Sequence, residues 1–249
     1  MAIEQELQAR LDAVRRNIAA AARRAGRRPE EVQLIAVTKT VAADRVAALA
    51  RLGLRDFGEN RVEEAEEKLP AIEALVGAET LAAQHWYLVG HLQSRKARRA
   101  IEIFDQIHSV DTVRLASRLD RLLARQGRRL PVLLEVNISG EASKYGLAAG
   151  GWPGDPEQSA SLYAKIEDIL KLEHLEVRGL MTVAPLVPDP EAVRPVFRRL
   201  KELRDALASR WPEHPWRELS MGMSDDYEVA IEEGATMVRL GRALFGPRG

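Results

Sequence analysis

The chain has 249 residues, enough to bury a large apolar core and within the size at which an α/β barrel forms one domain. Its 37 basic and 37 acidic residues cancel, so net charge gives no reason to expect binding to nucleic acid or to an anionic membrane. The absence of cysteine excludes disulfides, thiolate metal ligands and a cysteine nucleophile. There is no leader-like N-terminus and no apolar run long enough to span a bilayer, so we expect a cytoplasmic protein.

Apolar residues repeat with a helical period first and then in short runs. Leu7, Leu11, Val14 and Ile18 are three or four positions apart, which predicts an amphipathic helix ahead of any strand. Eight candidate strands follow, separated by stretches of helical periodicity. They are residues 34–39, 56–60, 85–90, 104–110, 131–138, 177–184, 218–223 and 237–241.

The alternation of these runs with helices predicts the fold class. Strands that are apolar on both faces and alternate with helices are typical of a parallel sheet covered by helices. Eight such units in about 250 residues predict an α/β protein, a single TIM (β/α)8 barrel with an extra N-terminal helix, as one domain over residues 1–249. A doubly wound open sheet is the competitor, but no G-x-G-x-x-G motif follows the first strand.

Local signals predict where several elements begin and end. Gly53 is expected to end the helix after the first strand, and Asp111 to cap a helix that begins at Thr112. Ser224 and Gly234 bracket a further short helix. Residues 148–161 are rich in Gly, Pro and Ser, which predicts a loop inserted ahead of the helix that leads to the sixth strand.

Lys39 ends the first apolar run, at the strand end where TIM barrels gather their functional residues. An isolated lysine in that position more often only reaches solvent. Other strand ends here also carry polar residues or glycine, among them Asn60, Ser220 and Arg239. In such surroundings a lysine of lowered pKa would be a nucleophilic amine that forms a Schiff base, either with a sugar-like substrate or with pyridoxal phosphate.

A pyridoxal phosphate site would also need a phosphate cradle, which barrels commonly build after strands seven and eight. Ser220 and Gly222 end the seventh run, and the amides of Gly241 and Arg242 follow the eighth at the start of a short helix. Amides at a helix N-terminus favour an anion, and glycine lets a phosphate approach the backbone. By itself this signal is weak, since a glycine after a strand is often only a turn.

Several motifs resemble one known family. They are AVTKT, FGENRVEE, WYLVGHLQSRKAR, SVDTVRLA, VNISGEASKYG, VRGLMTVAP and LSMGMSDDYEVAIEEGATMVRLGRALFG. Together they resemble the pyridoxal phosphate homeostasis protein family over nearly the whole chain. The resemblance implies a barrel similar to the N-terminal domain of alanine racemase, with pyridoxal 5'-phosphate held as an internal aldimine.

The resemblance also implies roles for individual residues. Lys39 would be the Schiff-base lysine, Arg239 would face the pyridine nitrogen, and Asn60 would lie beside the ring. Lys144 matches a lysine associated in the family with secondary cofactor handling. Some members carry a second lysine two positions after the Schiff-base lysine, where this chain has Val41.

The phosphate ligands follow from the same comparison of motifs. Ser220, with the amides of Gly241 and Arg242, would hold the phosphate. No residue is expected to ligate a metal, because His108 has no second histidine at ligand spacing.

Arg239 bears on what the cofactor would do. An acid opposite the pyridine nitrogen keeps the ring protonated as an electron sink, whereas arginine keeps its own proton and weakens that sink. Alternatively, Arg239 is a salt-bridge residue inside the barrel, with Glu59 or Glu135 as its partner.

We therefore expect no catalytic residues, and a carrier that buffers pyridoxal phosphate and delivers it to apo forms of dependent enzymes, as the resemblance implies. Racemisation needs an acid/base group on each face, and beyond Lys39 the candidates are His91 and Tyr145, residue types that usually only pack. The alternatives are an amino-acid racemase of weak or narrow activity and a Schiff-base aldolase without cofactor.

Two charged stretches are interpreted as exposed helix faces. QSRKARR, residues 93–99, is expected to be solvated, although it could steer an anionic cofactor or an acceptor protein. ENRVEEAEEK, residues 59–68, would be the exposed side of the second helix, with its acids near the N-terminus. We expect a monomer without nucleic-acid or membrane partners.

Overall fold

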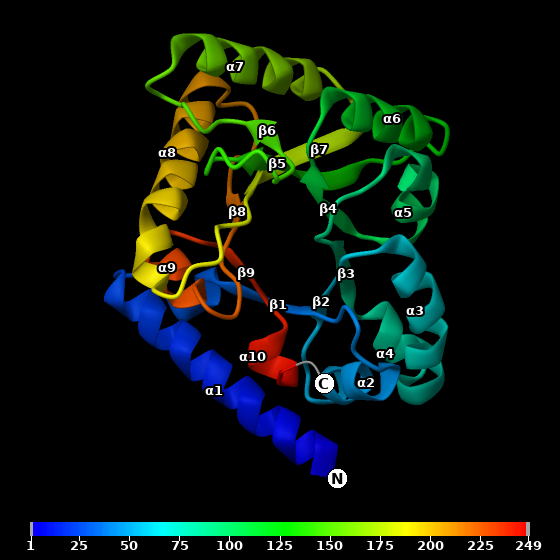
Figure 1. Ribbon diagram of the computed structural model, residues 1–249. Coiled ribbons are helices and arrows are strands. Elements are labelled where there is room, and N and C mark those ends of the chain that lie inside the picture. Colours follow the sequence, from blue (N-terminus) through cyan, green and yellow to red (C-terminus); the bar gives the residue numbers. More distant parts are fainter. Residues whose placement is uncertain (1, 248–249) are drawn as a thin grey trace.

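Eight parallel strands close into a barrel in the computed structural model, which describes residues 2–247 (Figure 1). The strands follow one another round the barrel in chain order, and pairing of β4 with β5 and of β1 with β9 leaves no open edge. They are β1 (Gln33–Val37), β2 (Asp56–Glu59), β3 (His85–Leu88), β4 (Gln106–Val110), β5 (Leu130–Asn137), β7 (Leu175–Met181), β8 (Glu218–Ser220) and β9 (Met237–Leu240). The two-residue strand β6 (Leu147–Ala148) pairs with the C-terminal end of β5.

The predicted TIM barrel and all eight predicted strands are confirmed. Seven of the eight predicted runs continue past the last residue of their strand, because the chain leaves the sheet at the C-terminal rim before the run ends. The residues just beyond the strands therefore form the rim itself, and it is there that the predicted site residues Lys39, Asn60 and Gly241 lie.

Helices surround the barrel on its outer face (Figure 1). They are α2 (Ala43–Arg51), α3 (Val62–Val76), α4 (Ala78–Ala82), α5 (Ala97–Ile103), α6 (Val113–Ala124), α7 (Pro156–Leu170), α8 (Arg194–Arg210), α9 (Tyr227–Glu232) and α10 (Arg242–Phe245), with the 3-10 helices η1 (Pro29–Glu31), η2 (Ser94–Lys96) and η3 (Pro190–Val193). None of the helices within residues 2–247 is long and apolar enough to cross a membrane.

The predicted N-terminal helix is α1 (Ala2–Arg24), and it takes the place of a missing barrel helix. The last βα unit ends in α10, which has only four residues and covers little of the sheet. Instead α1 packs against α2, α9 and α10, and its Leu7, Leu11, Val14 and Ile18 are all at most 5 % exposed. Burying each of these larger side chains stabilises the fold by about 1.5–3 kcal/mol.

The predicted element ends are confirmed in part. Gly53 follows α2 with φ 82° and Gly234 ends α9 with φ 103°, conformations that glycine adopts without strain. Asp111 is not the cap of α6. The cap is Thr112, which has an extended backbone and whose hydroxyl accepts a hydrogen bond of 3.2 Å from a backbone amide of the helix. Ser224 does not begin α9, which starts three residues later.

The predicted loop at residues 148–161 is wrong in extent. Its first residue belongs to β6, and α7 already begins at Pro156, so the irregular part is residues 149–155. Asp155 caps α7, accepting bonds from two amides at 3.0 Å, and proline suits the first helical position. Its place ahead of the helix that leads to the sixth barrel strand is confirmed.

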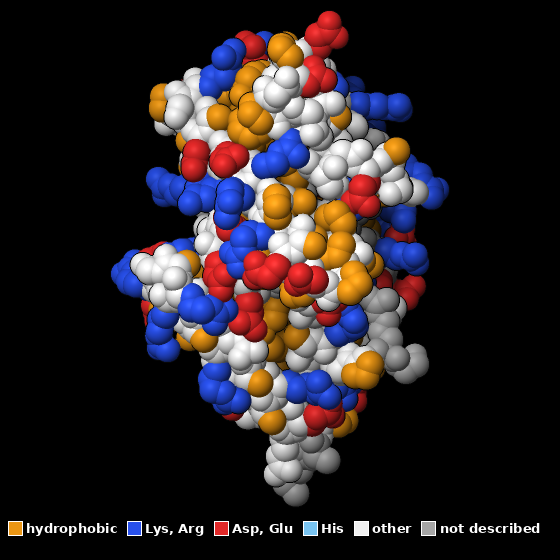
Figure 2. All heavy atoms as spheres, turned by 60° about the vertical axis from the view of Figure 1, so that its left-hand side comes forward, with side chains coloured by type: hydrophobic (Ala, Val, Ile, Leu, Met, Phe, Trp, Pro, Cys, Tyr) orange, Lys and Arg blue, Asp and Glu red, His pale blue; other side chains and the backbone are white. Residues whose placement is uncertain are grey.

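Opposite charges alternate over the face formed by α1, α8 and α9, as Figure 2 shows. Arg24 of α1 lies 2.6 Å from Glu232 of α9, and Arg194 of α8 bonds Glu232 at 2.6 Å and Glu233 at 3.0 Å. Arg198 also reaches Glu233, at 3.0 Å. Arg24, Arg194 and Arg198 are thus matched by carboxylates.

Candidate functional site

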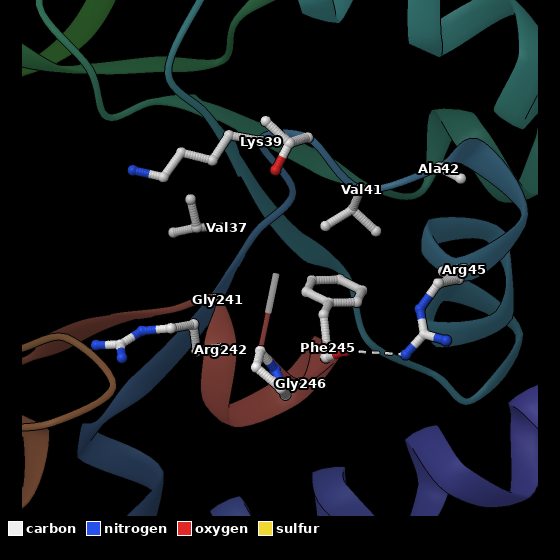
Figure 3. Close-up of a pocket in the computed structure, with 11 residues that line it drawn as sticks. Val37, Lys39, Val41, Ala42, Arg45, Gly241, Arg242, Phe245 and Gly246 are labelled. Atoms are coloured by element: carbon white, nitrogen blue, oxygen red, sulfur yellow. Dashed lines mark hydrogen bonds between the residues drawn. The ribbon is translucent and has the colours of Figure 1, made fainter. Parts of the chain in front are cut away.

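Lys39 and Arg242 line one cavity of about 560 Å³ at the C-terminal ends of β1 and β9. The two strands pair with Ala36 beside Leu240, so the residues that follow them meet although they lie far apart in sequence. In Figure 3 the side chains of Lys39 and Arg242 extend to the same side, with Val37 between them. The structure thus brings together Lys39, Gly241 and Arg242, three of the predicted site residues.

The backbone turns sharply after Lys39. Thr40 has φ 62°, which a β-branched residue rarely adopts and which costs about 1–3 kcal/mol. Its amide is held by a hydrogen bond of 2.5 Å to Oε1 of Glu64. Sequence reasoning missed this turn, because threonine carries no signal for a left-handed conformation.

A buried ion pair lies behind Lys39. Lys68 of α3 donates through Nζ to the Thr38 carbonyl at 2.7 Å, to Glu59 Oε1 at 2.5 Å and to Glu64 Oε1 at 2.9 Å. Burial raises the pKa of Glu59, and the hydrogen bond from Lys68 offsets part of that rise. The prediction that residues 59–68 are simply an exposed face is wrong, because Glu59 is fully buried and the Lys68 side chain is 9 % exposed.

The start of α10 forms the other wall of the Lys39 cavity. Gly241 is the N-cap residue and Arg242 the first helical residue. The loop after β8 supports this turn, since Ser224 Oγ accepts a bond of 3.2 Å from the Ala243 amide and Asp225 pairs with the Arg242 guanidinium. The predicted phosphate cradle thus has a fixed backbone, and its role as a cradle stays a prediction.

Ser220 and Arg239 lie inside the barrel. Arg239 donates through Nη1 to Ser220 Oγ at 2.7 Å and through Nη2 to the Thr182 carbonyl at 2.8 Å. Ser220 Oγ also lies 3.0 Å from Nδ1 of His108. Burial lowers the pKa of Arg239 to about 10, so it remains a cation at neutral pH. Burial and the Arg239 charge hold the pKa of His108 well below its usual value, so His108 is neutral.

The salt-bridge alternative for Arg239 is not what the structure shows. Within residues 2–247 no carboxylate lies within 4 Å of its guanidinium, and Glu59 pairs with Lys68 instead. Glu135 acts on Arg239 only through its charge. Burial raises the pKa of Glu135 to about 7, nearby Asp111 raises it too, and Arg239 opposes them. Glu135 Oε2 has no hydrogen-bond partner among the described residues.

Asn60 lines a neighbouring cavity of about 230 Å³ together with His91 and Lys96. It is not among the residues that line the Lys39 cavity. His91 lies 3.0 Å from Asp111 and stacks on Tyr145 with ring centroids 3.8 Å apart. The two candidates for a second acid/base group are therefore packed on each other.

Gly90 allows the backbone of Asn60 to approach, and Gly90→Ala is expected to displace it. A Cβ at this position would lie 2.4 Å from the Asn60 carbonyl oxygen and 2.7 Å from its Cα. Both are backbone atoms, so the strand end must shift, at a cost of about 1–3 kcal/mol in the free energy of unfolding. Urea unfolding measures the loss. Gly154→Ala is the control, because its added Cβ would meet only one atom, at 3.6 Å; an equal loss in both variants would contradict the prediction.

Lys144 lies in the segment that follows β5 on the rim. It forms an ion pair with Glu141, and its Nζ lies 3.4 Å from Ser139 Oγ. These contacts tie the lysine to its own loop. Its part in cofactor handling stays a prediction.

Within residues 2–247 no group of three or more histidine or acidic residues could hold a metal ion. The described residues at and below this rim provide a primary amine, a buried cationic donor and the backbone amides of a short helix.

Comparison with known proteins places this arrangement in a family. The family described as alanine racemase, N-terminal domain, matches residues 9–249. A pyridoxal phosphate homeostasis protein of Aquifex aeolicus is 38% identical over 239 residues, covering 96% of this chain and 97% of that protein. The Escherichia coli protein of the same name is 39% identical over 237 residues, covering 94% of each.

Solved structures agree with the sequence comparison. The structure of PipY of Synechococcus elongatus with pyridoxal phosphate bound has a TM-score of 0.79 and 37% identity, covering 96% of this chain and all of that one. An alanine racemase of Clostridium difficile is 17% identical with a TM-score of 0.65, and the match covers 98% of this chain but only 56% of the racemase. This match shows a likeness of fold alone. The chain belongs to the family of pyridoxal phosphate homeostasis proteins, whose barrel is that of the alanine racemase N-terminal domain.

Proposed function

We propose that this chain binds pyridoxal 5'-phosphate through Lys39 and serves in pyridoxal phosphate homeostasis. One observation carries the proposal: the Lys39 amine and the start of α10 at Gly241 and Arg242 line the same cavity. An amine fits an aldehyde, and amides at a helix start fit a phosphate, so this donor set matches both ends of the cofactor. The likeness to PipY, solved with the cofactor bound, supports the same conclusion.

Each residue has a distinct part in this proposal. Lys39 would bond the cofactor aldehyde, Ser220 and the amides of Gly241 and Arg242 would hold the phosphate, and Asn60 would lie beside the ring. When bound, the cofactor supplies an electrophilic carbonyl carbon attached to an electron-withdrawing ring. Arg239 has five N–H donors, of which two are used inside the barrel, so it can still donate to the ring nitrogen.

The role is that of a carrier and not of a racemase. Arg239 keeps its proton and so leaves the ring nitrogen neutral, which weakens the electron withdrawal that carbanion chemistry needs. A second acid/base group is also needed, and the two candidates, His91 and Tyr145, are stacked on each other with ring centroids 3.8 Å apart. A monomer in the cytoplasm that hands the cofactor to apo forms of dependent enzymes completes the proposal.

Lys39→Ala is expected to abolish covalent cofactor binding. With the amine gone, no bond to the aldehyde forms, so the visible absorption band that wild-type protein shows with added cofactor is absent in the variant. Borohydride reduction followed by peptide mapping should place the adduct on Lys39. Lys144→Ala is the control and retains the band; an adduct that maps elsewhere in wild-type protein contradicts the proposal.

Solvent deuterium exchange separates a carrier from an enzyme. The loaded protein is incubated with amino acids in heavy water, and uptake of deuterium at the α-carbon is followed. A carrier shows no steady uptake, but it restores activity when mixed with an apo-enzyme that needs the cofactor. Uptake at catalytic rates would instead establish the racemase, and a colourless protein with aldehyde-lyase activity would establish the aldolase.

A further inference from the structure

Four arginines line one small cavity on the outside of the barrel, away from Lys39. The cavity measures about 290 Å³ and lies between η2 and α6. Its lining residues are Ser94, Arg95, Arg114, Arg118 and Arg121, and none of them lines the Lys39 cavity. Four of the five are thus cations, from two segments that are not adjacent in sequence.

These arginines lack the acidic partners that the basic residues just after Arg95 have. Within residues 2–247 none of the four lies within 4 Å of a carboxylate, whereas Lys96, Arg98 and Arg99 of the neighbouring stretch are all ion-paired. The predicted solvated face of residues 93–99 holds for Arg95, Arg98 and Arg99, which are exposed, whereas Lys96 is half-buried. Arg95 also lines the cavity.

The arginines of α6 share one face of the helix. Arg114, Arg118 and Arg121 are four and three positions apart, and like charges at these spacings destabilise a helix. The one acidic residue of α6, Asp120, accepts a bond of 2.8 Å from the amide of His174. An anion in the cavity would neutralise the repulsion that the helix itself leaves uncompensated.

Two of the side chains are anchored in a way that leaves donors available. Arg118 donates through Nε to the Ser94 carbonyl at 2.8 Å, and Arg121 donates through Nε to the Ser117 carbonyl at 3.1 Å. In both cases the terminal amino groups of the guanidinium are not used. Arginine presents these groups as a planar fork that matches the oxygens of a phosphate.

The lining also selects the kind of ligand. It contains no aromatic or apolar side chain, although protein interfaces are centred on such residues and single-stranded nucleic acids stack on aromatic ones. The volume lies at the lower end of the range for small-molecule sites. A compact anion of more than one charge fits better than a macromolecule.

We propose that Ser94, Arg95, Arg114, Arg118 and Arg121 form a second anion site that binds a compact phosphate-bearing ligand. The ligand is either an inorganic phosphate or a phosphate ester, since both offer the same oxygens to the guanidinium groups. The site does not depend on the chemistry of Lys39.

Calorimetric titration at low ionic strength tests the proposal with inorganic phosphate, pyrophosphate and methyl phosphate. We expect Arg114→Gln and Arg118→Gln each to weaken binding of the best of these probes about tenfold. The matched control is Arg16→Gln on α1, an exposed arginine that loses the same charge, with a change of less than about twofold. Arg114 makes no hydrogen bond within residues 2–247, so its replacement leaves the contacts of the fold intact.

The order of the three affinities distinguishes the two sources. Tightest binding of methyl phosphate assigns the site to a phosphate ester, and tightest binding of pyrophosphate or phosphate assigns it to an inorganic anion. Unchanged affinity in Arg114→Gln and Arg118→Gln, an equal loss in Arg16→Gln, or no heat with any probe would each overturn the proposal.

Discussion

Lys68→Met is expected to lower the free energy of unfolding by about 3–5 kcal/mol, because it leaves the buried carboxylate of Glu59 without its cation. Only the Thr38 hydroxyl, at 2.5 Å, would still bond that carboxylate, and Glu59 Oε2 already has no partner among the described residues. Urea unfolding at pH 7 measures the loss. It should shrink at lower pH, since protonation removes the buried charge.

The ion pair also has a consequence for the site. Lys68 bonds the carbonyl of Thr38, the residue before Lys39, so its loss should weaken cofactor binding as well as stability. Glu59→Gln combined with Lys68→Met should recover much of the stability, because no charge remains buried. Lys171→Met, which breaks two exposed ion pairs, should leave the unfolding midpoint near that of wild type. If Lys68→Met behaved like Lys171→Met, the buried pair would not have the role described here.

Glu135→Gln is expected to stabilise the protein at pH 8 by up to about 3 kcal/mol. Burial raises the pKa of Glu135 to about 7, against 4.5 for an ordinary glutamate. The folded state therefore holds a proton between about pH 4.5 and 7 that the unfolded state has lost. Above pH 7 the folded protein has to bury the charge, and the neutral amide avoids that cost.

The sign of this effect can be followed by unfolding measurements between pH 5 and pH 8. The contribution of Glu135 to the free energy of unfolding of the wild type is greatest below pH 4.5 and is lost as the pH rises to 7. The difference in the free energy of unfolding between the variant and wild type should therefore grow over the same range. Glu173→Gln, which replaces an exposed carboxylate, is the control and should show no such trend. A constant difference at all pH values would contradict the assignment.

The fold was largely predictable from the sequence because barrel strands and helices alternate with different periods. The ends of elements were less so. Asp111 and Thr112 are adjacent residues that can both cap a helix. The sequence does not show that the Asp111 carboxylate contacts the His91 ring instead, at 3.0 Å. Similarly, the loop predicted at residues 148–161 hid the start of α7, since Pro156 suits a helix start as well as a turn.

The candidate site was predictable only as far as strand ends locate it. Lys39, Gly241 and Arg242 follow paired strands, so their meeting follows from barrel closure. The pairing of Glu59 with Lys68 could not be predicted from the strand ends, because α3 must turn back over β2 before Lys68 can reach Glu59. Nor could one motif show that Arg95 meets arginines of α6, since that depends on how η2 packs.

The pairing of β1 with β9 has a consequence for how the protein is made. About 200 residues separate Lys39 from Gly241, and at the usual pace of synthesis β1 waits roughly 10 to 40 s for its partner strand to be translated. Until then the barrel cannot close and α1 has neither α9 nor α10 to cover. A nascent or interrupted chain therefore carries Lys39 without the cavity around it, and under the proposed function only a polypeptide that includes β9 and α10 would bind the cofactor.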